Sequence, residues 1–285
     1  MPRPSTIVAA ALFTSLWAAS ISACGGPSED DVRRSVAEYD LGAGLLQEQN
    51  VAGAFQHLQE AVRLDPDHAD AHLLLGNLFL FRQDFERSEH HFQEALRANE
   101  ALGRSGRPAL SSEANNSLGV LYVHWQRYDD AVRVLREATG DLMNHRPYFA
   151  WGNLGWAYYE QHDYAQALPA LQQSVQINPS FCNGWFRIGQ VHFAQGQGAA
   201  QGQGQGVAED AARESFERAE DALTRALEIE DESCQRLQDA WRLRGETRAR
   251  LGRRDDAVAD FERCVELESD TDAGRSCAAM LESTP

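Results

Sequence analysis

The stretch WGNLGWAYYEQHDYAQALPALQQSVQINP, residues 151–179, decides the fold of this 285-residue chain. Gly155 lies inside a helical apolar pattern. A small residue, Ala167, follows it after 12 positions, a large one, Leu171, after 16, and a second small one, Ser174, after 19. Small residues let two helices approach closely, and a large residue fills the gap that remains. The stretch therefore predicts two helices packed as a hairpin.

Six glycines repeat this arrangement along the chain, at spacings of 34, 43, 36, 34 and 56 residues. They are Gly42, Gly76, Gly119, Gly155, Gly189 and Gly245. In the five repeats without an internal insertion, small residues stand again at offsets 12 and 19 and a large one at offset 16. The large residues are Leu58, Phe92, Leu135, Leu171 and Phe261. In the fifth repeat, Leu223 takes the same place after a longer gap.

This pattern resembles the tetratricopeptide repeat over most of residues 35–270. The resemblance implies an all-α fold, a right-handed superhelical solenoid of about six repeats. A short helix within residues 271–285 is expected to cap the apolar end of the stack. The Gly/Gln-rich segment 195–208 is expected to form a mobile loop between the two helices of the fifth repeat.

Residues 1–23 are predicted to be a lipoprotein signal peptide. One arginine precedes a hydrophobic run over residues 7–19, which is too short to span a membrane. Residues 21–24, Ile-Ser-Ala-Cys, resemble a bacterial lipobox. We therefore expect acylation of Cys24, palmitate included, followed by a flexible tether over residues 24–34. An ordinary secretory signal with a chance cysteine is the alternative.

The residues after Cys24 indicate to which membrane the lipoprotein is sorted. Gly25 and Gly26 follow it, without the aspartate that resembles an inner-membrane retention signal. We therefore expect a lipid-anchored protein of the outer membrane that faces the periplasm.

The composition excludes several classes of function. Hydrophobic residues make up 43% of the chain and charged residues 24%, as in an ordinary folded body. The formal net charge is −17, and such a surface repels phosphate backbones, so nucleic acid is not an expected partner. All 26 basic residues are arginine, which excludes Schiff-base catalysis and a phosphate-binding P-loop lysine.

A search for catalytic motifs gives no candidate residues. The chain has no nucleophile elbow, no phosphate-cradling glycine loop and no HExxH. His68 and His72 stand four residues apart, and His90 and His91 are adjacent; we interpret all four as surface or groove histidines. We therefore expect a non-enzymatic protein with no cofactor, no metal site and no small-molecule substrate.

Four cysteines remain beside Cys24, which suggests two disulfides in an exported chain with three possible connectivities. Cys182 and Cys234 lie near the starts of the first helices of repeats five and six. Cys264 lies late in the last repeat helix, and Cys277 lies in the expected capping helix. This register favours Cys182–Cys234 and Cys264–Cys277. Four buried free thiols are the alternative, and a zinc site is weaker because no C-x-x-C pair is present.

The first helix of each repeat lines the concave face of such a solenoid, and the side chains projected there are apolar and aromatic with scattered amides. They are Tyr39, Leu46, Leu73, Asn77, Leu80, Phe81, Asn116, Val120, Phe149, Trp156, Tyr159, Phe186 and Phe193. Repeats one to four are expected to present one continuous apolar track, which would bind a protein partner. Alternatively, these side chains pack against one another inside the superhelix and bind no partner.

An acylated cysteine, a short tether and about six repeats are together similar to the type IV pilus biogenesis lipoproteins called pilotins. Residues 115–135, NNSLGVLYVHWQRYDDAVRVL, and residues 149–155, FAWGNLG, carry the resemblance, with Phe181 and Cys182 later in the chain. The resemblance implies that the chain binds secretin subunits and promotes their outer-membrane insertion and multimerisation.

Two other classes of function share these features. One is a periplasmic scaffold lipoprotein that recruits proteases or cell-wall enzymes. The other is an accessory subunit of an enzyme, with a metal site at the histidines. Neighbouring genes discriminate the first of these from a pilotin, because pilus genes favour a pilotin and peptidoglycan enzymes favour a scaffold.

Overall fold

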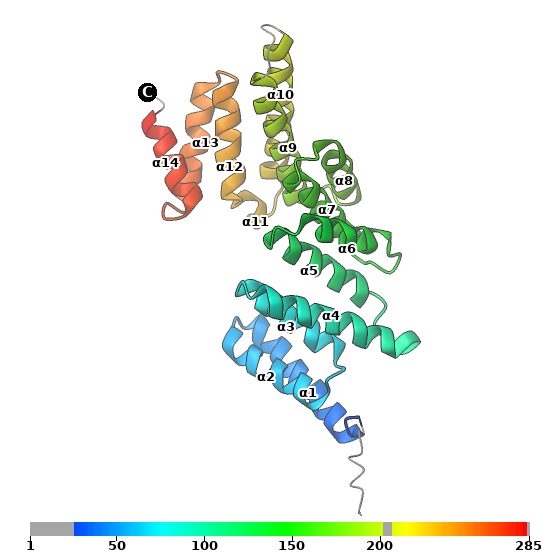
Figure 1. Cartoon of the computed structure of the whole chain (residues 1–285). Coiled ribbons are helices and arrows are strands. Elements are labelled where there is room, and N and C mark those ends of the chain that lie inside the picture. The colour runs from blue at the N-terminus through cyan, green and yellow to red at the C-terminus, as the bar shows by residue number, and fades with distance from the viewer. Residues whose placement is uncertain (1–25, 202–206, 284–285) are drawn as a thin grey trace, which may run out of the picture.

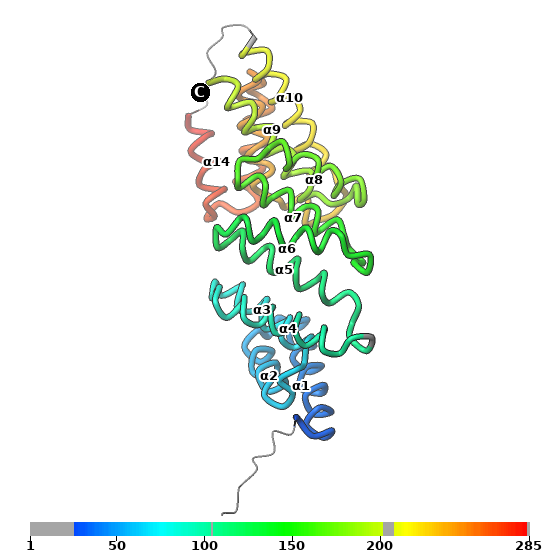
Figure 2. Tube along the Cα trace, turned by 45° about the vertical axis from the view of Figure 1, so that its right-hand side comes forward, coloured from blue at the N-terminus to red at the C-terminus, as the bar shows by residue number. Residues whose placement is uncertain are grey.

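The chain forms an elongated, curved stack of helical hairpins (Figure 1). The computed structural model describes residues 26–201 and 207–283, which contain fourteen α-helices, one short 3-10 helix and no β-strand. The N-terminal hairpin lies at one end of the stack and α14 at the other. The helix direction changes gradually between them, so that α4 and α10 point in clearly different directions (Figure 1, Figure 2).

Six helical pairs make up the repeats, and each pair consists of a first and a second helix. The first helices are α1 (Glu29–Gln47), α3 (Ala69–Phe81), α5 (Leu110–His124), α7 (Pro147–Glu160), α9 (Cys182–Ala200) and α12 (Gln238–Arg250). The second helices are α2 (Val51–Leu64), α4 (Phe85–Leu102), α6 (Tyr128–Gly140), α8 (Tyr164–Ile177), α10 (Val207–Glu228) and α13 (Arg254–Leu267). The remaining elements are η1 (Gly103–Ser105), α11 (Glu232–Gln235) and α14 (Asp272–Ser283).

The glycine register is confirmed as the contact between the paired helices. A Cβ added at Gly119 would lie 2.3 Å from Leu135 Cγ, and one added at Gly155 would lie 2.5 Å from Leu171 Cγ. A Cβ added at any of the other four glycines would lie 2.5–2.9 Å from the large residue of its own pair. Glycine is required here because a side chain would overlap its neighbour, so the small and large residues interlock.

The structure corrects the prediction that residues 195–208 of the fifth repeat form a loop. Helix α9 continues through Ala200 and α10 begins at Val207; only residues 202–206 lie outside the described chain. A Cβ added at Gly196 would lie 2.7 Å from the Phe216 ring, so this glycine sits in a tight helix contact. Packing against α10 therefore outweighs the poor helix propensity of the Gly/Gln sequence.

The predicted tether is also shorter than residues 24–34, because α1 already begins at Glu29. The Ser28 hydroxyl accepts a hydrogen bond from the Asp31 amide at 3.1 Å and caps the helix. The acidic side chains of Glu29, Asp30 and Asp31 in the first turn favour the positive end of the helix dipole. Cys24 and the predicted signal peptide lie outside the described residues.

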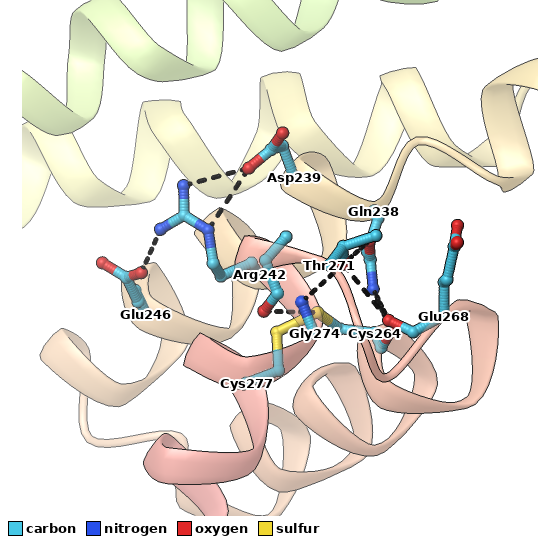
Figure 3. The surroundings of a disulfide bond; sticks show 10 residues. Gln238, Asp239, Arg242, Glu246, Cys264, Glu268, Thr271, Gly274 and Cys277 are labelled. Carbon is cyan, nitrogen blue, oxygen red and sulfur yellow. Dashed lines mark hydrogen bonds and ion pairs between the residues drawn. A yellow bond between two sulfur atoms is a disulfide. The ribbon is translucent and has the colours of Figure 1, made fainter.

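The C-terminal helix packs on the last repeat as a cap (Figure 3). The Gln238 amide nitrogen at the start of α12 donates to the carbonyl oxygens of Cys264 and Glu268, at 2.7 and 2.6 Å. Its amide oxygen accepts from the Thr271 hydroxyl, directly before α14, at 2.6 Å. One side chain thus connects α12, the end of α13 and the entry to α14.

Both disulfides have the pairing that the repeat register predicts. Cys182 at the start of α9 is bonded to Cys234 on α11, with 5.7 Å between their Cα atoms. Cys264 on α13 is bonded to Cys277 on α14, with 6.2 Å between their Cα atoms. No described helix is both long enough and apolar enough to cross a membrane.

Candidate protein-binding face

Contacts between repeats define the inner side of the curve. Each first helix touches the first helix of the next repeat, from α1 and α3 through to α9 and α12. The second helices of successive repeats have no comparable contacts within the described residues. Because the first helices are closer together, they lie on the inner side of the stack. We call their exposed surface the inner face.

The thirteen side chains predicted for this face fall into three classes of exposure. The partly buried ones are Tyr39, Leu46, Leu80, Asn116, Val120, Phe149, Trp156 and Tyr159. The exposed ones are Asn77 and Phe81, and the buried ones are Leu73, Phe186 and Phe193. The predicted set therefore does not lie on one surface.

Three of these residues belong to the core, which corrects their prediction as partner-binding residues. Leu73, Phe186 and Phe193 expose only 6%, 7% and 8% of their surface. Leu73 joins the main core cluster, and Phe193 packs on Phe216 of α10 with 5.5 Å between ring centroids. Neighbouring helices cover these positions, so these three side chains are not available to a partner.

Among the predicted binding residues, the most exposed apolar side chain lies at the C-terminal end of α3. Phe81, its last residue, exposes 79% of its surface, while the adjacent Leu80 is partly buried against the core. An aromatic side chain this exposed contributes little to folding and offers a large apolar area to a partner. Phe81 is therefore the most accessible of the predicted binding residues.

A group of interacting side chains on the inner face joins α5, α7 and α9. The Trp156 ring meets His124 edge-on, with 5.2 Å between centroids, and its Nε1 donates to the Glu160 carboxylate at 2.9 Å. Arg187 Cζ lies 4.4 Å from the centroid of the Trp156 ring, and Nη1 donates to Gln190 Oε1 at 2.9 Å. We call these five residues the Trp156 cluster.

Four members of the cluster are half-buried and His124 is exposed, and this partial burial shifts the pKa of groups in and beside the cluster. Burial lowers the pKa of Arg187 below its ordinary value. Burial, followed by the nearby Arg187 charge, lowers the pKa of His124, and burial raises the pKa of Tyr159 beside it. At neutral pH His124 is therefore neutral, and Arg187 supplies the positive charge of the cluster.

Arg187 and His124 were not among the predicted binding residues. The repeat register could have indicated Arg187, because Arg187 precedes Gly189 by two residues, just as Asn153 precedes Gly155. Asn153 also reaches back to the preceding repeat, where its amide nitrogen donates to Asn116 at 2.9 Å. A side chain two residues before the repeat glycine thus contacts the inner face of the previous repeat.

The sixth repeat presents a polar inner surface. Arg242 forms ion pairs with Asp239, at 3.3 Å, and with Glu246 (Figure 3). The positive charge of this arginine is therefore balanced within the chain.

The histidines of the second repeat lie partly in the core, which corrects their interpretation as surface or groove residues. His72 on α3 is buried, and its Nδ1 lies 2.9 Å from His91 Nδ1 on α4. His72 Nε2 lies 3.0 Å from the Pro66 carbonyl, and the His91 ring stacks on Phe79. No group of three or more His, Cys, Asp or Glu side chains among the described residues is placed to hold a metal ion.

The second repeat should lose stability in mild acid. Burial, and then the neighbouring His72 and His90, lower the pKa of His91 to about 4, against 6.5 ordinarily. His91 therefore binds a proton near pH 6.5 in the unfolded chain but only near pH 4 in the folded chain. The contribution of neutral His91 to the free energy of unfolding is complete above pH 6.5 and is lost as the pH falls towards 4.

The measurement is urea denaturation at pH 7 and pH 4.5. Because His91 is partly exposed, its share of the acid-induced loss should be about 1–2 kcal/mol, and His91→Gln should remove that share. His145→Gln, at an exposed loop position, is the matched control and should leave the loss unchanged. Equal losses in both variants would contradict this assignment.

Comparison with known proteins agrees with the geometry. Models of the tetratricopeptide repeat match residues 45–104, 148–181 and 239–271. Together with the interlocked hairpins and their stacking, these matches define the class: the chain is an all-α tetratricopeptide-repeat solenoid.

Within that class, the chain resembles type IV pilus biogenesis proteins. It is 28% identical over 181 residues to the type IV pilus assembly protein PilF of Pseudomonas aeruginosa, which covers 61% of this chain and 68% of PilF. The solved structure of Pseudomonas aeruginosa PilF superposes with a TM-score of 0.65 at 17% identity, over 88% of this chain and all of that one. The crystal structure of PilW, described as a widely conserved type IV pilus biogenesis factor, superposes with a TM-score of 0.64 at 18% identity. The superposition covers 86% of this chain and 98% of that chain.

The solenoid shape by itself is less specific. A chain of the APC/C hetero-tetramer Cut9–Hcn1 superposes with a TM-score of 0.68 at 11% identity, over 90% of this chain and 43% of that chain. Since a protein of such low identity has the same fold, the superpositions show the fold alone. The likeness to a pilus protein therefore rests on the sequence match with PilF.

Proposed function

We propose that this chain is a non-catalytic factor of type IV pilus biogenesis that binds a protein partner through its inner face. In its more specific form, the proposal is that the chain is a pilotin, lipid-anchored in the outer membrane through Cys24, which promotes assembly of the pilus secretin. The partner is then a secretin subunit.

The observation that carries the proposal is the 28% identity with PilF over 181 residues. A shared stretch of this length covers several repeats, whereas the match to a single repeat model spans as few as 33 residues, 239–271. The site supports a binding role, because the inner face combines an exposed aromatic side chain, Phe81, with the partly buried aromatic and charged groups of the Trp156 cluster. Exposed aromatic groups on a solenoid are suited to hold an apolar segment of another protein.

Phe81→Ala and Trp156→Ala are expected to reduce the amount of heat-resistant secretin multimer in cells. Aromatic anchors dominate such contacts, so each change should weaken binding by about 2 kcal/mol or more, roughly 30-fold in Kd. Phe81→Ala is the cleaner variant, since the side chain is 79% exposed and its removal leaves no cavity. The partly buried Trp156 requires that helicity and melting of the variant are checked.

Leu142→Ala is the matched control. Leu142 is 98% exposed, in the loop between α6 and α7, and its truncation removes exposed apolar area away from the first helices. Multimer levels should stay normal in this variant. Normal levels with both Phe81 and Trp156 replaced, in a stably accumulated protein, would place the partner elsewhere or refute the secretin assignment.

The anchoring part of the proposal has its own test. Cys24→Ala should leave the repeats folded, because the first repeat helix begins only at Glu29, and should abolish the incorporation of labelled fatty acid. The protein should then leave the outer-membrane fraction. Continued labelling of the Cys24→Ala protein would refute the lipobox assignment.

A further inference from the structure

We propose that one edge of the solenoid lies against the surface of a phospholipid bilayer, and that exposed apolar side chains along this edge contact the lipid. The inference rests on the proposed function in one respect, the anchoring of the chain through Cys24. It adds a second membrane contact, which sets how the inner face is presented to a partner.

The edge is formed by the connections that lead from each second helix to the next first helix. Because the two helices of a pair run in opposite directions, these connections follow one another along the same edge of the stack, together with the start of α1. In Figure 1 the start of α1 and the α4–α5 and α6–α7 connections lie on the right-hand side. Figure 2 shows the same two connections at the right-hand limit of the molecule. We call this edge the connection edge.

Exposed apolar side chains gather in the middle of the connection edge. Among the described residues, the exposed large hydrophobic side chains are Val36, Leu41, Phe81, Leu102, Leu142, Met143 and Ile177. The last four lie on this edge: Leu102 ends α4, Leu142 and Met143 lie between α6 and α7, and Ile177 ends α8. They belong to three successive connections, so they form a row along the edge.

Two aromatic rings extend this row. Tyr148 in the first turn of α7 and Phe181 directly before α9 are partly exposed and meet edge-on, with 5.2 Å between their centroids. Tyrosine, which joins an apolar ring to a polar hydroxyl, is enriched where a membrane meets water. We call Leu102, Leu142, Met143, Tyr148, Ile177 and Phe181 the edge patch.

The connections that carry the edge patch are not acidic, although the chain has a net charge of −17. Residues 103–109, 141–146 and 178–181 together contain three arginines and one aspartate. By contrast, residues 65–68 contain two aspartates, and residues 229–237 contain three acidic side chains and one arginine. Since the anionic lipids of a bilayer repel acidic surfaces, the middle of the edge is the part that can approach a membrane most closely.

The start of α1 argues that a bilayer covers the edge patch. Glu29, the first residue of α1, lies on the connection edge and follows Cys24 by five residues. Five residues span at most about 18 Å even when fully extended. An acyl group on Cys24 therefore holds this edge close to the lipid headgroups. The anchor alone leaves the solenoid free to turn, whereas apolar contacts of the edge patch add a second attachment that orients it.

This orientation leaves the inner face open to a partner. Phe81 and His124 are the last residues of α3 and α5, so they lie at the edge opposite the patch. The secretin multimer control is unaffected, because Leu142→Ala changes one of six patch side chains and keeps both the anchor and the inner face.

The test uses residues 24–285, which include every described helix, attached to vesicles of phosphatidylethanolamine and phosphatidylcholine. A maleimide lipid in the vesicles reacts with the Cys24 thiol; the other four cysteines are bonded in pairs and do not react. This attachment imposes the anchor, so the result does not depend on whether cells acylate Cys24. The photoreactive amino acid p-benzoylphenylalanine replaces Leu142, Ile177 or Phe81 in separate preparations, and mass spectrometry detects phospholipid adducts after irradiation.

Positions 142 and 177 should form phospholipid adducts and position 81 should form none. Position 81 is the matched control, because Phe81 is 79% exposed but lies at the opposite edge. Leu142→Asp/Met143→Asp should lower the adduct yield at position 177 roughly tenfold or more, because two apolar side chains then no longer leave water. Both replaced side chains are exposed, so the fold is kept. Phe81→Asp should leave the yield at position 177 unchanged.

Equal adduct yields at positions 81 and 142, or no phospholipid adduct at positions 142 and 177, would overturn the proposal. Adducts of these two positions with a second copy of the chain in place of lipid would overturn it as well. If both positions form lipid adducts but Cys24 takes up no labelled fatty acid in cells, the lipid contact of the edge stands and the anchoring assignment fails. If Cys24 is acylated in cells but neither position forms a lipid adduct, the anchor stands and the edge contact is refuted.

Discussion

Replacement of Asp260 with alanine is expected to lower the free energy of unfolding of the sixth repeat by about 3–5 kcal/mol. Asp260 lies on α13 and exposes 2% of its side chain. Its Oδ1 accepts from Arg244 Nη2 at 2.7 Å, and its Oδ2 accepts from Arg248 Nη1 at 2.9 Å. Alanine would leave both guanidinium groups of α12 without this buried carboxylate, and an uncompensated buried charge is strongly destabilising.

The same network joins the sixth repeat to the fifth. Glu220 on α10 accepts from Arg248 Nε at 3.0 Å and also pairs with Arg253. Arg248 therefore bridges two carboxylates, Asp260 and Glu220, that belong to different repeats. Loss of Asp260 should weaken the contact between α10 and α12 as well as the last hairpin.

Hydrogen exchange localises the effect. In a solenoid each repeat contacts only its neighbours, so protection should fall in α12 and α13 and remain unchanged in α3 to α6. Asp239→Ala is the matched control in the same repeat, because Asp239 exposes 58% of its side chain and its ion pair contributes about 1 kcal/mol or less. A loss in Asp260→Ala no larger than in Asp239→Ala would contradict the expected role of the network.

The fold could be predicted because its signal is local and repeated. Gly119 and Leu135 stand 16 residues apart, and the distance of 2.3 Å that an added Cβ would have from Leu135 shows why neither can change freely. The same pair recurs in every repeat, at the same spacing in all but the fifth, so one hairpin predicts the next. Sequence spacing is sufficient to predict this contact because both residues lie in a single helical pair.

The exposure of the inner face could not be predicted in the same way. Leu73 and Phe81 both lie on α3 and were both predicted on the inner face, yet one exposes 6% and the other 79%. The difference depends on how closely the next repeat approaches, which the periodicity of one helix does not determine. Contacts between repeats also place Arg187 against Trp156, two residues that are 31 positions apart in the sequence.

Composition misled the prediction at the fifth repeat. The Gly/Gln-rich sequence after Gln195 is typical of a loop, but α9 continues through it to Ala200. The lack of a side chain at Gly196 is what permits the close contact with Phe216 of α10. A glycine that indicates flexibility in isolation can therefore mark a tight helix crossing, and only the position of the partner helix distinguishes the two.

The bond between Cys182 and Cys234 should be the more stabilising of the two disulfides. It closes a loop of 52 residues, against 13 for Cys264–Cys277. Because the entropy lost by the unfolded chain grows with the logarithm of loop length, the upper limits are about 4 and 3 kcal/mol. We expect Cys182→Ala/Cys234→Ala to lower the free energy of unfolding by about 2–4 kcal/mol.

Peptide mapping of nonreduced protein from an oxidising compartment should recover both linked pairs. The double variant should melt below the oxidised and above the fully reduced unaltered protein, because it keeps the Cys264–Cys277 bond and the cavity that alanine leaves at the buried Cys182 and Cys234 is small. If reduction of the unaltered protein has no effect on melting while the double variant is destabilised, lost packing rather than the bond is responsible. Alkylation of four free thiols in the native protein would refute the pairing, and α9 and α11 would then be joined only by the apolar cluster that contains Cys182, Phe186 and Cys234.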